Sequence, residues 1–558
     1  MATPEHGNGN SYASAFGQLS ERLIAEHWDF YPTAGARIGR HEYDGRLPDL
    51  TPASVNRRKA EIRRGLSDLQ ALPTDTLSGE DLLSRRMLEL FLQRELFTFE
   101  ELRPLESNPM RQAGFLNVGN YVRRDYAPLE DRLRAASSAL RQVPDFLTTL
   151  DTALRNELSR HIVDMSVESY GGMAQFYRND LQSFAGQVED REIAADFTAS
   201  IEGAASALDE FVEKLALRCG GPDNDFAIGS HLYSRMLATG EALELPLQRV
   251  ESVGRDDLEK NLAGIREVAA SIAPDKSIEQ LVSEISRTHP TAVGLIPDTR
   301  HLLEDIRQAL IDHDIISLPS QDRCQVVETP SYMRYAFAAM DSAGALETQA
   351  TESFYYVTPV EEHWTAQQAE EWLSKFDYNT LRIISIHEVY PGHFVHHLHN
   401  RYGRALPLVN RVATSYAFTE GWAHYTEQMM LETDYGADRP ELLLTQLLEA
   451  LVRNCRYMCS MAMHTGDMTV DEATRFFMDN AFMAEYPARR EALRGTFDPG
   501  CLNYTLGKLI ILKLREDYRS EHNGRYSLKG FHDRLLSYGA PPLPLLRDVM
   551  LSGEGAPL

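Results

Sequence analysis

Cysteine is scarce in this chain of 558 residues, which contains five cysteines in all. So few cysteines, in an odd number, do not make the disulfide framework of a small secreted protein, and we expect a reducing compartment. Cys455 and Cys459 lie one helical turn apart. This spacing is compatible with a metal-binding pair, but we favour two small apolar residues on one buried helix face.

Basic residues are also few relative to acidic ones. The chain has 56 basic and 82 acidic residues, so its formal net charge is -26. Nucleic acids and anionic membranes are polyanions, so this balance argues against both as main partners. The chain has no apolar run near the ~18 residues that a membrane span needs. Its polar start, MATPEHGNGN, is typical of a disordered leader rather than a signal peptide. We therefore predict a cytoplasmic protein without a nucleic-acid or membrane partner.

Amphipathic helix is the dominant pattern. Hydrophobic residues make up 43% of the chain and recur at three- and four-residue spacing between turn signals, which predicts a mostly α-helical globular fold. The predicted helices cover residues 13–28, 52–72, 80–102, 128–155, 158–182, 191–218, 247–272, 277–288, 297–313, 363–376, 380–400, 409–433, 440–466, 470–482, 501–520 and 542–551.

A short region between residues 314 and 360 has the texture of strands. The runs CQVVETP (324–330) and SFYYVTP (353–359) are rich in β-branched and aromatic residues and predict a small sheet of two to four strands. We expect this sheet beside a histidine-rich helix. The chain then divides into a leader (1–12), an N-terminal helical part (13–313) and a catalytic part (314–558), with the two parts forming one continuous body.

The segment SIHEVYPGHFVHH (385–397) is similar to the zinc-peptidase signature HExxH, but its second histidine comes six residues after the first. Six residues turn an ideal helix by about 600°, so His387 and His393 would point about 120° apart. Pro391 removes a backbone donor and clashes with the carbonyl group of His387, while Gly392 tolerates unusual backbone angles. We predict a local bulge that brings His393 back towards His387.

A third ligand is expected in AFTEGWAHYTE (417–427), where Glu420 lies in an apolar helix. Two histidines from one helix and a glutamate from the next make a zinc site with three protein ligands and an open position. We therefore predict that His387, His393 and Glu420 bind one zinc ion (Zn²⁺) per chain. Glu388 is the predicted general base.

The remaining histidines have weaker interpretations. His424, one turn after Glu420, is an alternative ligand, and His41-Glu42 is interpreted as an exposed loop because no suitable second histidine follows it. Packing or surface positions are expected for His396, His397 and His399.

Four segments resemble the bacterial domain-of-unknown-function family 885 (DUF885): HEVYPGH, EGWAHYTE, GCLNYTLGKLIILKLRED (500–517) and YPTAGARIGRHEYDGRLPDL (31–50). That family is grouped with gluzincin-like metallopeptidases and is similar in fold to Taq-type zinc carboxypeptidases. The resemblance implies an elongated, mostly helical, zincin-like body, a groove holding the site, and a downstream glutamate ligand at Glu420. Arg456 and His464 match the family pattern, whereas His396 stands where glutamine is frequent and Ser460 where aspartate is common.

Peptide hydrolysis also needs a hydrogen-bond donor facing the oxyanion. Tyr504 and His464 are the candidates, with Tyr504 preferred over an ordinary buried tyrosine. Arg456 or Lys508 is the candidate for holding a substrate carboxylate, with structural cations as the alternative.

These residues predict a zinc-dependent metallopeptidase that acts on short peptides, with an exopeptidase of the carboxypeptidase type as the favoured form. Two alternatives stay open at this point. One is a helical scaffold that binds metal or peptide without turnover, and the other is a zinc hydrolase of a non-peptide amide.

Overall fold

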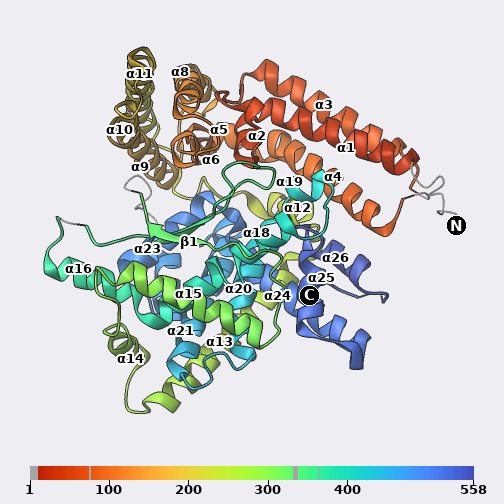
Figure 1. The fold of residues 1–558 in the computed structure, drawn as a ribbon, viewed down its shortest axis with the longest axis vertical. Coiled ribbons are helices and arrows are strands. Elements are labelled where there is room, and N and C mark those ends of the chain that lie inside the picture. Colours follow the sequence, from red (N-terminus) through yellow and green to blue (C-terminus); the bar gives the residue numbers. More distant parts are fainter. Residues whose placement is uncertain (1–10, 75–76, 331–336, 362, 554) are drawn as a thin grey trace.

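The computed structural model describes residues 11–74, 77–330, 337–361, 363–553 and 555–558. Over these residues the chain is mostly helical with a small three-stranded sheet, which confirms the predicted fold class (Figure 1). None of the described helices combines the length and the apolar character that crossing a membrane requires.

Helices of the first half are α1 (Ser11–Phe30), α2 (Pro32–Ile38), α3 (Pro52–Ala71), α4 (Gly79–Phe97), α5 (Pro104–Ser107), α6 (Met110–Ala113), α7 (Asn120–Arg123), α8 (Leu129–Ala153), α9 (Arg160–Phe176), α10 (Gln182–Ala185), α11 (Arg191–Ala216), α12 (Gly229–Glu241), α13 (Leu247–Ile272), α14 (Ile278–Ile285) and α15 (Leu295–Asp312). Those of the second half are α16 (Ala366–Leu373), α17 (Tyr378–Glu388), α18 (His393–Tyr402), α19 (Leu408–Val412), α20 (Tyr416–Glu432), α21 (Pro440–Thr465), α22 (Val470–Ala481), α23 (Glu485–Phe497), α24 (Asn503–His522), α25 (Leu528–Leu536) and α26 (Leu543–Met550).

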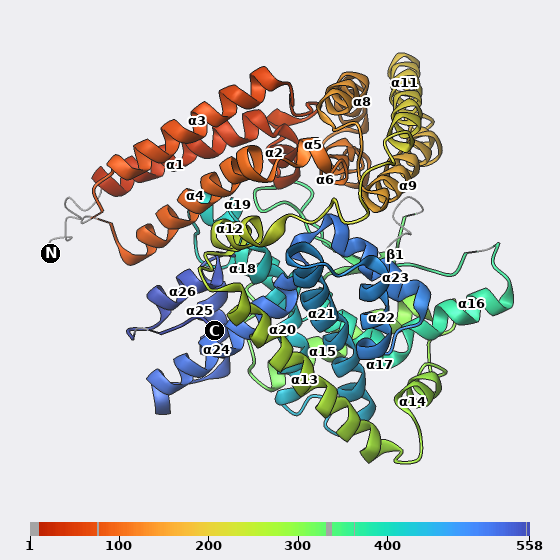
Figure 2. The same cartoon turned by 180° about the vertical axis from the view of Figure 1, so that it is seen from behind.

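Two apolar cores hold these helices together. The smaller core is formed mainly by α8, α9 and α11, which stand side by side at one end of the molecule (Figures 1 and 2). The larger core joins α1 and α4 to the helices of the second half, with Leu23 and Leu535 among its buried members. Burial of apolar surface therefore continues across residue 313, the predicted boundary between the two parts.

The sheet has the strand order β1-β3-β2. Its strands are β1 (Gln325–Glu328), β2 (Ala338–Asp341) and β3 (Phe354–Val357), with β1 parallel and β2 antiparallel to β3. The two predicted strand runs contain β1 and β3, whereas β2 is built from small residues. Ser385 of α17 lies 3.4 Å from the hydroxyl group of the buried Tyr355, so the sheet packs against the helix that carries His387.

The crossing of α20 and α24 depends on two glycines. A Cβ atom on Gly507 would lie 1.8 Å from the carbonyl oxygen of Ala417, and one on Gly421 would lie 2.4 Å from the Cα atom of Gly507. The two backbones therefore touch, which only glycine allows. Glu420 precedes Gly421 and Tyr504 lies one turn before Gly507, so this contact sets the two predicted site residues side by side.

Gly507→Ala is expected to lower the free energy of unfolding by about 1–3 kcal/mol, because the added methyl group must push α20 and α24 apart. Denaturant unfolding followed by circular dichroism measures the change. Gly171→Ala, inside α9 where a Cβ atom meets nothing within 4 Å, is the matched control and should not destabilise the protein. Equal stability of the Gly507→Ala variant and the wild type would contradict the close crossing.

Candidate metal centre

The predicted helix over residues 380–400 is interrupted. α17 ends at Glu388 and α18 begins at His393, with a cis peptide bond between Tyr390 and Pro391 in the connection. The amide of Gly392 donates to the carbonyl of Ile386 at 3.0 Å, which is six residues back instead of the four of a regular helix. The prediction of a bulge within one helix is therefore wrong, because the chain uses a full break. The break nevertheless absorbs the two extra residues between the histidines, as the spacing requires.

Two contacts hold this break in place. A Cβ atom on Gly392 would lie 1.7 Å from the carbonyl oxygen of His387, so only glycine fits where the chain folds back on α17. The indole of Trp422, from α20, donates to the carbonyl oxygen of Pro391 at 3.0 Å. The carbonyl that the break leaves without a helical partner is thereby satisfied.

The structure brings the three predicted ligands together. The Nε2 atoms of His387 and His393 each lie 3.5 Å from Oε2 of Glu420, and the three candidate ligand atoms are all within 4.8 Å of one another. Ligands placed about 2.1 Å from a tetrahedral zinc ion are ~3.4 Å apart, so this donor set fits the ion. The two imidazole planes are nearly perpendicular, at 89°.

Glu427 orients the first histidine. Its Oε1 atom accepts a hydrogen bond from Nδ1 of His387 at 2.7 Å, which leaves Nε2 facing Glu420. Burial alone would raise the pKa of Glu427, but Arg453 at 3.1 Å and the imidazoles of His387 and His424 outweigh it and hold the pKa well below its usual value. A carboxylate behind a ligating imidazole is the arrangement that fixes a metal ligand.

His424, the alternative ligand, lies outside the cluster of candidate ligand atoms. Its Nδ1 atom lies 3.2 Å from Oε2 of Glu427, and its ring is fully buried. Sequence reasoning missed Glu427, although Glu427 lies seven residues after Glu420 and hence on the same face of α20.

Glu388 lies between the candidate metal cluster and the sheet. Its Oε2 atom accepts a hydrogen bond of 3.1 Å from the amide of Met340 on β2. In the part of the chain that the structure describes, β2 pairs with β3 alone and so forms an edge of the sheet. The predicted general base is therefore held by a backbone group of an edge strand.

Tyr504 is placed beside the third ligand. The guanidinium group of Arg494 donates to its hydroxyl oxygen at 3.1 Å, which leaves the phenolic hydrogen free to donate. Burial and the charge of Glu420 raise the pKa of Tyr504, so its hydroxyl group stays protonated. Arg494 was not among the predicted site residues.

The other predicted site residues have different surroundings. Nε2 of His464 lies 2.7 Å from the carbonyl oxygen of Gly495, and its ring packs against Phe226 in a separate hollow. These contacts give His464 a structural position rather than a place in the cluster.

The two predicted carboxylate-binding cations are already paired. Arg456 makes two hydrogen bonds of 2.7 Å to Glu491, and the Nζ atom of the buried Lys508 lies 2.8 Å from Asp257. Because each charge is compensated within the protein, the alternative of structural cations describes both better than substrate binding does.

Buried contacts explain the positions that depart from the family pattern. Ser460 lies 3.0 Å from the hydroxyl group of Tyr233 and donates to the carbonyl of Pro499 at 2.7 Å. His396 packs against Phe418. The packing interpretation is confirmed for His396 and His399, both of which are buried.

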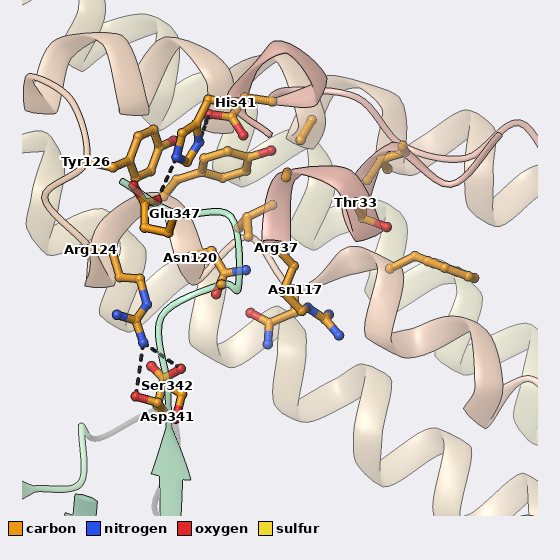
Figure 3. Close-up of a pocket in the computed structure, with 18 residues that line it drawn as sticks. Thr33, Arg37, His41, Asn117, Asn120, Arg124, Tyr126, Asp341, Ser342 and Glu347 are labelled. Atoms are coloured by element: carbon orange, nitrogen blue, oxygen red, sulfur yellow. Dashed lines mark hydrogen bonds and ion pairs between the residues drawn. The ribbon is translucent and has the colours of Figure 1, made fainter. Parts of the chain in front are cut away.

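Residues of the N-terminal part contact the C-terminal end of β2 in the pocket shown in Figure 3. Arg124 contacts both the side chain and the carbonyl oxygen of Asp341, the last residue of β2, at 3.0 Å. His41 bridges Asp44 at 3.1 Å and Glu347 at 2.8 Å and is half-buried, so the interpretation of the His41-Glu42 pair as an exposed loop is wrong for His41, whereas Glu42 is exposed. The strand that holds Glu388 is thus fixed by residues from the opposite end of the sequence.

Comparison with known proteins gives a family and a fold. A family model described as "Bacterial protein of unknown function (DUF885)" matches residues 32–550. A candidate lipoprotein of unknown function from Shewanella oneidensis has a TM-score of 0.81 at 22% identity, with 96% of this chain and 100% of that chain covered. A candidate lipoprotein from Colwellia psychrerythraea has a TM-score of 0.80 at 16% identity, with 96% and 98% covered. Such low identities establish the fold alone, and no curated protein matches the chain. The cytoplasmic location stays a prediction.

Proposed function

The chain belongs to the bacterial DUF885 family, whose description assigns no activity, and we propose that it is a zinc-dependent metallopeptidase. The convergence of His387, His393 and Glu420 within 4.8 Å carries this proposal. Two histidines and one carboxylate form the ligand set of catalytic zinc sites that keep one position open. Glu388 follows the first ligand directly in the sequence, so a base stands next to the proposed metal.

Each residue then has a role in hydrolysing an amide bond. Bound zinc would polarise the attacking water and the scissile carbonyl group. Glu388, held by the amide of Met340, accepts a proton from the water and delivers it to the leaving amine. Tyr504 donates its free hydrogen to the developing oxyanion, while Arg494 holds its oxygen from behind.

A peptide is the proposed substrate because Glu388, the proposed base, accepts a hydrogen bond from the backbone of an edge strand. An extended peptide can add to such an edge through main-chain hydrogen bonds, which a non-peptide amide cannot do to the same extent. A carboxypeptidase-like exopeptidase acting on short peptides is the form that we propose.

Zinc analysis and peptide cleavage test this function together. Purified protein should contain about one zinc ion per chain and should cleave members of a mixed peptide library. Chelation should stop the cleavage, and added zinc should restore it. Amidated peptides should survive if the enzyme removes residues from the C-terminus. Protein without zinc, or intact peptides under every condition, would overturn the proposal and favour a scaffold.

Glu427→Gln is expected to weaken zinc binding by about 10- to 100-fold, because a neutral amide no longer fixes the imidazole of His387 and leaves Arg453 without its buried counter-charge. Competition with a chromogenic chelator measures the zinc Kd. Glu432→Gln, at the solvent-facing end of the same helix, is the control and should bind zinc like the wild type. Unchanged affinity in the Glu427→Gln variant would contradict the orienting role.

A further inference from the structure

A second cavity begins one helical turn from the candidate metal centre. Its volume is about 360 Å³, and α4, α12, α20 and α24 contribute to its walls. Tyr416 lines the cavity, four residues before Glu420 and so on the same face of α20. The ring of Tyr416 also packs edge-on against Tyr504, with 5.7 Å between the ring centroids. Tyr416 therefore stands between the cavity and the residues proposed for catalysis.

Two arginines on the cavity wall form no ion pair with the residues that the structure describes. The guanidinium group of Arg94 donates to the carbonyl oxygen of Thr414 at 3.3 Å and lies over the ring of Phe91. That of Arg111 makes no hydrogen bond to any residue that the structure describes. Within the same described ranges, no carboxylate lies within 4.0 Å of either group. Arg453 and Arg456, in contrast, are both paired.

The acidic groups of the cavity are satisfied by other partners. Glu241 accepts a hydrogen bond from the hydroxyl group of Ser415, at the start of α20. Asp498 accepts hydrogen bonds from the amide of Gly500 at 3.1 Å and from the hydroxyl group of Tyr416 at 3.2 Å. The carboxylates of Glu241 and Asp498 thus have hydrogen-bond donors, while their charges act on Arg94 and Arg111 from beyond ion-pair distance.

Guanidinium groups that line a cavity without an ion-pair partner favour an anionic ligand. The surrounding protein lowers the pKa of Arg94 and of Arg111, because it displaces water that would solvate their charges. Arginine nevertheless stays protonated in proteins, so both guanidinium groups keep their charge. Water still reaches Arg111, which is exposed, and Arg94, which is half-buried, and an anionic ligand would take the place of that water. Arginine pairs with a carboxylate through two parallel hydrogen bonds.

Asn503 adds a polar group suited to a peptide. Its side chain is 4% exposed and lines the cavity next to Tyr504 in the sequence. The Oδ1 atom has no hydrogen-bond partner among the described residues. A buried amide without a partner is unfavourable, and a peptide N–H group would satisfy it.

We propose that Arg94 and Arg111 bind a carboxylate group of the peptide substrate, with Asn503 contacting the peptide group beside it. This inference rests on the proposed peptidase function and names its substrate class: peptides with a carboxylate close to the bond that is cut. Either a C-terminus or an acidic side chain supplies this chemistry. Arg111 also borders a neighbouring cavity lined by Tyr31 and Phe99, so space continues beyond the arginines for either source.

Binding to a variant without the general base tests the inference separately from turnover. Isothermal titration on Glu388→Gln protein as purified would compare N-acetyl-tetraalanine, its C-terminal amide, and an amidated peptide of equal length with one glutamate. Adding Arg94→Gln or Arg111→Gln should weaken binding of a carboxylate-bearing peptide by about tenfold or more and leave the uncharged amide unaffected. Adding Arg86→Gln, which removes an exposed charge from the same helix as Arg94, should change neither.

The outcomes separate the source of the carboxylate and the two levels of the proposal. Arginine-dependent binding of the free acid assigns the site to the C-terminus, and arginine-dependent binding of the glutamate peptide assigns it to a side chain. Equal Kd values with and without the arginines, or no binding of either carboxylate peptide, would overturn the inference. Arg111→Lys, which keeps the charge but loses the paired donors, should give an intermediate Kd. Lack of zinc and of cleavage in the wild type would instead refute the peptidase function and leave this binding result unaffected.

Discussion

Glu388→Gln is expected to lower the rate of zinc-dependent peptide cleavage by about 10²–10⁴, the usual contribution of a positioned acid–base group. Glutamine has nearly the same shape as glutamate but cannot take a proton from the attacking water. Its carbonyl oxygen can still accept the hydrogen bond from Met340, so β2 should keep its place. The loss should therefore appear in kcat, with KM little changed.

Zinc content should stay at the wild-type level in this variant, because the proposed ligand atoms belong to His387, His393 and Glu420. Initial rates on one cleaved library peptide, together with metal analysis of the same sample, measure both quantities. Glu371→Gln, on the exposed surface of α16, is a control that should keep full activity. Glu388→Gln protein that binds zinc and cleaves at the wild-type rate would exclude Glu388 as the base.

Helical periodicity predicted most of the long helices because their apolar faces are continuous. The predicted helix over residues 247–272 coincides with α13, which buries Val250, Leu258 and Ile265 on one side. Other helices were missed, notably α12, α23 and α25. In α23 the buried side consists of Ala488, Ala492, Gly495 and Thr496, and such small residues leave little hydrophobic signal.

The break between α17 and α18 shows what periodicity cannot predict. Val389, Tyr390, Phe394 and Val395 are all buried, so the apolar pattern runs through the connection without a gap. The interruption depends on contacts made across the fold, above all the bond from Trp422 to the carbonyl of Pro391. The Pro-Gly pair did predict a distortion at this point, though not a complete break.

Ligand candidates were predictable because they lie in two short motifs, whereas their supports were not. Glu427 is recognisable only once Glu420 is placed on a helix, and Arg453 reaches Glu427 from α21. The link between Glu388 and Met340 needs a sheet whose register a sequence does not specify. Arg456 and Lys508 were predicted to bind substrate because they are charged and lie close to a motif. Both are paired with a carboxylate inside the protein, because a buried charge without a counter-charge is unfavourable.

A protein in which both His387 and His393 are replaced by alanine is expected to lose its zinc. The free energy of zinc binding in four-ligand sites is about 10–16 kcal/mol, so removing two ligands should weaken affinity by about 10⁴-fold or more. The break between α17 and α18 is held by Gly392 and Trp422 rather than by the imidazoles, so the variant should still fold. Metal analysis after gel filtration, with circular dichroism on the same sample, measures both.

Single substitutions distinguish the ligands from their neighbours. His396→Ala removes a buried imidazole three residues after His393, outside the candidate cluster, and should keep its zinc. Glu420→Gln should lose most of it, because an amide is a poor replacement for a ligating carboxylate.

Stoichiometric zinc in the double histidine variant would show that the metal binds elsewhere. His424 would then be the first alternative, since its ring is buried beside Glu427 and its Nε2 atom has no partner among the described residues. Zinc lost on His424→Ala but kept in the double variant would move the centre to that side of α20.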